Sequence, residues 1–223
     1  MSEIDPTAPE LGTLDATKAE GDRVISTGTT TVGIAVADGV VVGTDRRASL
    51  GGRFVANKGV VKVEPVHPSA VLTLVGSVGG AQSFVRTLRS EASLYERRRG
   101  RPLSIHALAT MAGNFARGGP FFAINPVLGG VDDDGAHVYS IDPAGGVLAD
   151  DYTVTGSGTQ VATGTLEGNY DPDASVEEAA DLAARAVAAA AERDTGSGNG
   201  VVLATVTDAE ISTETFDEPA AAL

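Results

Sequence analysis

Three consecutive threonines stand where the character of the chain changes. Thr29, Thr30 and Thr31 follow Gly28, at the border between 28 residues without regular periodicity and a β-rich stretch. If the chain were cut after Gly28, Thr29 would carry a free α-amine beside its own hydroxyl. The hydroxyl can attack a carbonyl carbon, and an amine with an ordinary pKa of about 7.7–8.0 can take its proton near neutral pH. Threonine also favours strands in general, so the run alone leaves both interpretations open.

Two charged residues further along the chain could serve such a nucleophile. Asp45 ends the second strand of a predicted hairpin, which returns its carboxylate towards Thr29. Lys62 stands between Val61 and Val63 in a predicted apolar strand, where the pleat turns its side chain either to solvent or into the core. Buried beside Asp45, it would stay charged through that partner and lower the pKa of nearby proton-transfer groups.

The sequence lacks the signatures of several other chemistries. Without cysteine it has no thiol nucleophile, disulfide or thiolate metal site. His67, His106 and His137 lie too far apart for a local metal-binding motif, and neither a phosphate-binding loop nor a G-x-S-x-G turn occurs. We therefore expect no metal and no cofactor.

Charge and composition narrow the possible partners. Thirty acidic against 16 basic residues give a net charge of −14, which disfavours binding to nucleic acid or to an anionic membrane. No apolar run approaches the roughly 20 residues of a membrane helix, and residues 1–28 lack the apolar stretch of an export signal. We expect a cytoplasmic protein. Lysine occurs only three times, and this acidic, lysine-poor composition favours a halophilic protein, the alternative being an ordinary acidic one.

The hydrophobic pattern predicts the elements that would hold these residues in place. A hairpin is expected over residues 30–37 and 40–44, joined by Asp38-Gly39. Further strands are predicted over residues 54–57, 60–66, 70–75, 121–131, 137–141, 147–154, 201–206 and 211–216. Helices are predicted over residues 77–99, 104–117, 160–169 and 176–193, the last with Ser175 and Glu178 as a capping box. Helices grouped between runs of strands favour an α+β fold with helices outside packed sheets.

Four stretches of the sequence carry a resemblance when they occur together: GTTTVGIAVADGVVVGTDRRAS, LVGSVGGAQ, TGSGT and AAAERDTGSGNG. In this order, over residues 29–216, they resemble the catalytic β subunit of the archaeal proteasome core particle, in a haloarchaeal-like form. That family has the four-layer αββα sandwich of the N-terminal nucleophile hydrolases. The resemblance implies a propeptide over residues 1–28, a catalytic domain over residues 29–217 and a flexible tail over residues 218–223.

The same resemblance implies a role for individual residues. Thr29 matches the nucleophile that autocleavage of the Gly28–Thr29 bond exposes, Asp45 the acid after the first hairpin, and Lys62 the active-site lysine, once one residue is inserted near residues 51–54. The remaining catalytic matches are Ser157, Asp194 and Ser197. All six being present argues against an inactive subunit.

Further matches concern the bound substrate. Gly76, before a predicted helix, would offer its N–H to the oxyanion, or would only permit the turn there. Ser49 would align the substrate backbone. The positions of the specificity pocket are all apolar: Ala48, Val60, Leu74 and Val78. Such a wall implies a chymotrypsin-like preference for large apolar residues before the cut, which Glu64 nearby could modify; the alternative is that the four are ordinary core residues.

The family assembles seven β subunits into a ring that pairs with a second β ring between rings of α subunits. Regulatory ATPases act through the α rings and supply unfolded proteins. The resemblance therefore implies a threonine endopeptidase that degrades unfolded chains. Two alternatives stay open: a non-catalytic structural β-ring subunit, and a bacterial-type proteasome-related threonine peptidase. The long leader and the RRAS segment favour the archaeal type, and removal of the leader would distinguish an active from a structural subunit.

Overall fold

The computed structural model describes residues 28–50, 52–118 and 124–222. The predicted leader, apart from Gly28, lies outside the described residues, as does the start of the strand predicted from residue 121.

The first sheet is built on the hairpin that begins beside Thr29. Strands β1 (Thr30–Val36) and β2 (Gly39–Asp45) pair antiparallel, with the turn at Ala37 and Asp38, one residue earlier than predicted. Strand β10 (Tyr152–Gly156) pairs with β1, and β11 (Val201–Val206) and β12 (Ile211–Phe216) extend the other side. The order β10-β1-β2-β11-β12 therefore places the residues after β10 and those before β11 on either side of Thr29.

The second sheet has the order β5-β6-β7-β8-β9. Its strands are β5 (Val63–His67), β6 (Ala70–Thr73), β7 (Val127–Asp132), β8 (Gly135–Ile141) and β9 (Val147–Asp150). A separate hairpin of β3 (Ala48–Leu50) and β4 (Phe54–Asn57) leads from the first sheet towards it. All pairings in the two sheets are antiparallel.

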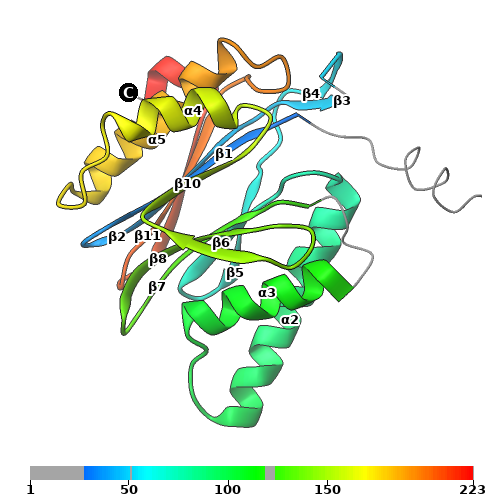
Figure 1. Cartoon of the computed structure of the whole chain (residues 1–223), viewed down its shortest axis with the longest axis vertical. Helices are drawn as coiled ribbons and strands as arrows, with labels where there is room; N and C mark the ends of the chain where they lie inside the picture. The colour runs from blue at the N-terminus through cyan, green and yellow to red at the C-terminus, as the bar shows by residue number, and fades with distance from the viewer. Residues whose placement is uncertain (1–27, 51, 119–123, 223) are drawn as a thin grey trace, which may run out of the picture.

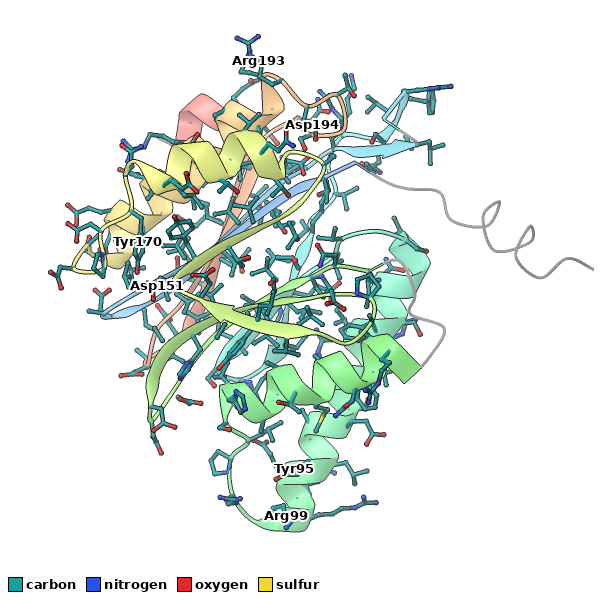
Figure 2. All side chains as sticks on the ribbon, in the orientation of Figure 1. Tyr95, Arg99, Asp151, Tyr170, Arg193 and Asp194 are labelled. Carbon is teal, nitrogen blue, oxygen red and sulfur yellow. The ribbon has the colours of Figure 1, made fainter. Side chains whose placement is uncertain are left out.

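One predicted strand is wrong. Residues 147–154 do not form a continuous strand: the chain leaves the second sheet after β9 and enters the first as β10, with the break at Asp151. There the Asp150 carboxylate accepts a hydrogen bond from the Asp151 N–H at 2.9 Å, a local bond that replaces a ladder bond. Asp151 marks this crossing in Figure 2.

Helices cover the outer face of each sheet (Figure 1). Helices α2 (Val78–Arg99) and α3 (Ile105–Gly118) pack on the second sheet, and α4 (Thr159–Glu167) and α5 (Val176–Ala191) pack on the first. Valines from both sheets fill the space between them, among them Val42, Val71 and Val127. The capping box of α5 is confirmed, with Ser175 and Glu178 bonding each other's backbone N–H. The α+β fold class, an αββα sandwich of four layers, is confirmed.

The C-terminal residues differ from the expected tail. Pro219–Ala222 form the short 3-10 helix η1, and Ala222 is buried in the cluster beneath α5. Small side chains such as alanine pack there at little entropic cost. None of the helices in the described part of the chain is long and apolar enough to cross a membrane.

Candidate active site

The hairpin of β1 and β2 brings Thr29 and Asp45 together. Thr29 directly precedes β1 and Asp45 ends β2, and the register Thr31↔Thr44 sets Asp45 level with Thr30. The Thr29 hydroxyl donates to Asp45 Oδ1 at 3.0 Å, and the Thr30 N–H donates to the same oxygen at 2.9 Å. Both Thr29 and Asp45 are almost completely buried, with 2% and 0% of their surface exposed.

Lys62 completes a triangle with these two residues. It lies one residue before β5 rather than within a strand, and only 4% of it is exposed. Its Nζ donates to Thr29 Oγ1 at 2.6 Å and to Asp45 Oδ1 at 2.7 Å. The period of a strand could not decide which way Lys62 points; the structure turns it inward because Asp45 supplies a buried anion.

Burial also changes the acidity of Lys62. Loss of solvation lowers the pKa of its ammonium below the ordinary value, although the Asp45 carboxylate opposes this shift. The positive charge of nearby Arg47 adds to the lowering. A lysine whose pKa is lowered gives up its proton more readily, so the hydroxyl of Thr29 lies 2.6 Å from a group able to exchange a proton with it.

The Asp45 carboxylate is held by five donors from separate parts of the chain. Thr29, Thr30 and Lys62 donate to Oδ1. The N–H groups of Arg47 and Gly198 donate to Oδ2, each at 2.9 Å. These bonds fill the acceptor sites of a carboxylate and fix its orientation.

A second chain of hydrogen bonds reaches the backbone nitrogen of Thr29. That N–H donates to Ser157 Oγ at 3.1 Å, and Ser157 Oγ donates to Asp194 Oδ2 at 2.6 Å. Ser197 Oγ donates to the same Asp194 oxygen at 2.6 Å and lies 2.7 Å from Thr30 Oγ1. Ser157 follows β10, whereas Asp194 lies in the loop after α5, where Figure 2 shows it beside an outward-pointing Arg193. All six predicted catalytic residues are therefore brought into one network.

Gly28 packs against a second glycine. A Cβ atom on Gly28 would lie 2.3 Å from the Cα of Gly196, and one on Gly196 would lie 2.5 Å from the Cα of Gly28. The Gly28 N–H donates to Ser49 Oγ at 3.0 Å, so Ser49 contacts the backbone just before Thr29. Hydrogen bonds to Ser49 and Ser157 thus fix the backbone on the two sides of the peptide bond between residues 28 and 29. Neither glycine has room for a side chain.

A small cavity of about 80 Å³ opens beside Thr29. Its lining includes every residue predicted for the specificity pocket: Ala48, Val60, Leu74 and Val78. Gly76, with φ of +94°, also lines it and forms a bridge to Ile124. A hollow of about 850 Å³ lies at the other end of the sandwich, around the β1–β2 and β7–β8 turns, and includes none of the predicted site residues.

Several residues of the network were missed by sequence reasoning, among them Gly198, whose N–H donates to Asp45. Thr30 bonds Asp45 and Ser197, and Gly196 packs on Gly28. Arg47 donates from Nε to Asn199 Oδ1 at 2.9 Å and from Nη1 to the Thr195 carbonyl at 3.0 Å. Asn199 has φ of +63°, the one positive φ of a non-glycine residue in the described chain. The signals available were the arginine pair after Asp45 and the glycine-rich GSGNG segment.

Comparison with known proteins gives consistent matches. Residues 25–206 match the protein-family model described as Proteasome subunit. The proteasome subunit beta of Halorhabdus utahensis is 68% identical over 219 residues, covering 98% of this chain and 94% of that protein. Proteasome subunit beta 2 of Haloarcula marismortui is 68% identical over 212 residues, covering 94% of this chain and 92% of that protein. These matches confirm the family that the sequence motifs indicated.

Proposed function

Because this chain belongs to the proteasome subunit family, as a β-type subunit, we propose that it is a threonine endopeptidase with Thr29 as its nucleophile. The observation that carries the proposal is the buried triangle of Thr29 Oγ1, Asp45 Oδ1 and Lys62 Nζ, with separations of 2.6–3.0 Å. Such distances are those at which a base can take the proton of an attacking hydroxyl. A structural subunit has no need of a buried lysine against Thr29, so the triangle favours the catalytic alternative.

Maturation is the first reaction in this proposal. The Thr29 nitrogen is part of the peptide bond to Gly28, so it cannot act as a base at that stage. In its neutral form Lys62 takes the hydroxyl proton as Oγ1 attacks the carbonyl carbon of Gly28, and the proton then passes to the leaving nitrogen of Thr29. The peptide bond breaks with transfer of the acyl group to oxygen, and water then hydrolyses the resulting ester. This step releases residues 1–28 and frees the α-amine of Thr29.

Substrate cleavage follows the same course with the freed amine as base. Oγ1 attacks the substrate carbonyl while the amine, directly or through water, moves the proton to the leaving nitrogen. The Ser157–Asp194 pair orients the amine, and Ser197 supports Asp194 from its other side. The N–H of Gly76 stabilises the oxyanion. Water then resolves the acyl-enzyme.

Specificity and assembly are part of the same proposal. The apolar wall of Ala48, Val60, Leu74 and Val78 favours leucine, phenylalanine or tyrosine before the cleaved bond, and Ser49 aligns the substrate backbone. The subunit assembles into seven-membered β rings stacked with α rings in the cytoplasm of a halophile, where regulatory ATPases supply unfolded proteins. The haloarchaeal relatives support this setting over the bacterial-type peptidase.

The N-terminus and mass of the assembled protein test the proposal. Active particles should have lost residues 1–28 and begin at Thr29, and persistence of the leader in active particles would refute the cleavage. Thr29→Ala should abolish peptidase activity and retain the leader, unless an active neighbouring subunit trims the leader partway. Thr213→Ala, the same change on the exposed strand β12, should alter neither.

A further inference from the structure

The cavity beside Thr29 combines an apolar wall with several polar and charged lining residues. Among the described residues that line it, Glu64 of β5 is the only acid. The two cations in the lining have other partners, since Lys62 bonds Asp45 and Arg47 bonds Thr195 and Asn199. Asp45 neutralises Lys62, whereas the acceptors of Arg47 are neutral, so Glu64 is the described lining residue that can attract a cationic side chain.

Glu64 is held by an arginine that does not itself line the cavity. Arg89 donates from Nη2 to Glu64 Oε2 at 3.2 Å and from Nε to the Pro65 carbonyl at 3.1 Å. A second bond to the Pro65 carbonyl comes from Nη2. These contacts anchor the planar guanidinium on a backbone oxygen and direct one N–H at the carboxylate.

Arg89 continues the wall of the cavity along α2. Val78 and Gln82 of this helix line the cavity, and Val85 and Arg89 follow at helical spacing on the same face. Arg89 thus lies beyond the cavity on the face that forms its wall, next to the acid at its edge.

We propose that Arg89 determines the charge selectivity of this site by neutralising Glu64. This inference rests on the proposed peptidase function and concerns the side chain that precedes the cleaved bond. A lysine or arginine side chain could lay its apolar stem along the wall and place its charge at Glu64. Arg89 bonds the Glu64 carboxylate and repels the charge of the substrate side chain. A cation left unpaired against the apolar wall is costly. The site therefore favours apolar side chains over basic ones.

The size of the effect follows from the exposure of the pair. The side chains of Arg89 and Glu64 are 49% and 39% exposed, so solvent and salt screen their interaction. Removing Arg89 should consequently change selectivity by about fivefold, the scale of a partly exposed ion pair, rather than by orders of magnitude.

The test compares two peptides that differ only in leucine or arginine before the cleaved bond. The measured quantity is the arginine-to-leucine ratio of kcat/KM on assembled particles. Arg89→Gln should raise the ratio about fivefold and leave cleavage of the leucine peptide within about twofold of wild type. Arg86→Gln removes the same charge from an exposed position of α2 without a bond to Glu64, and should leave the ratio unchanged.

Two further variants make the test specific to the ion pair. Adding Glu64→Gln to Arg89→Gln should return the ratio to the wild-type value. Glu64→Gln alone leaves Arg89 unneutralised, and should lower the ratio about fivefold, which tests the proposal even if Arg89→Gln fails to assemble. An unchanged ratio in Arg89→Gln or Glu64→Gln, or a raised ratio in the double variant, would overturn the role of Arg89. Wild-type particles that cleave neither peptide would instead overturn the proposed function.

Discussion

Replacing Gly28 by alanine should slow maturation strongly without harming the mature enzyme. The added Cβ would lie 2.3 Å from the Cα of Gly196, whereas non-bonded carbons rest at about 3.5–4.0 Å. Relief of this overlap requires a shift of more than about 1 Å. If Gly28 moves, its carbonyl leaves the path of Thr29 Oγ1. If Gly196 moves, it loses its 3.1 Å bond to Asp194. A misplacement of about 1 Å can cost 100-fold in rate, so we expect autocleavage about 100-fold slower.

A time course of intact mass after assembly measures this rate. Gly164→Ala is a matched control, because its Cβ would meet no atom within 4 Å and its site is the exposed side of α4. It should mature at the wild-type rate. Residue 28 is absent from the cleaved chain, so the peptidase activity per cleaved Gly28→Ala subunit should equal that of wild type. Maturation of Gly28→Ala within about threefold of wild type, under 1 kcal/mol of barrier, would refute the reasoning.

Three further substitutions test other parts of the site and core. Lys62→Arg should lower peptide turnover at least about 100-fold, roughly 2.7 kcal/mol of barrier, in particles of normal size. The larger guanidinium cannot reproduce the 2.6 Å bond to Thr29 and the 2.7 Å bond to Asp45, and near-normal turnover would contradict this reasoning. Asn199→Gly keeps the left-handed backbone but removes the acceptor for Arg47, and should lower kcat about tenfold. Asn199→Asp should have a kcat near that of wild type, and equal kcat values in the two variants would contradict the role of Asn199 as the acceptor for Arg47. Thr44→Val should raise the free energy of unfolding by about 1 kcal/mol in denaturant titrations, because the buried Thr44 hydroxyl finds no hydrogen-bond partner among the described residues; a loss of stability would point to a bound water.

Local pattern was sufficient to predict most of the elements. Helices α2, α3 and α5 are long and amphipathic, and the β11–β12 and β1–β2 pairs are close to the predicted bounds. The pattern failed at Asp151, because two strands that are adjacent in sequence enter different sheets. No local periodicity encodes that choice, which depends on the packing of the whole sandwich.

The candidate site shows the same limit. The type and order of Thr29, Asp45 and Lys62 suggested a nucleophile and its partners, but the direction of Lys62 depended on Asp45, 17 residues away in sequence. The contact of Arg47 with Asn199 joins residues 152 positions apart, and the packing of Gly28 on Gly196 is equally remote. Glycine at position 28 suggested backbone freedom, whereas its structural reason is lack of space.

The five hydrogen bonds to the Asp45 carboxylate affect the time at which the protein becomes active during its synthesis. Thr29, Asp45 and Lys62 leave the ribosome early, but Gly198, which donates to Asp45, and Ser197, which supports Asp194, come 135 or more residues after Lys62. At about 5–20 residues per second, the nascent chain carries Thr29, Asp45 and Lys62 together for roughly 7–27 s before the last of these groups is made. Translation itself thus delays self-cleavage until almost the whole domain has been polymerised.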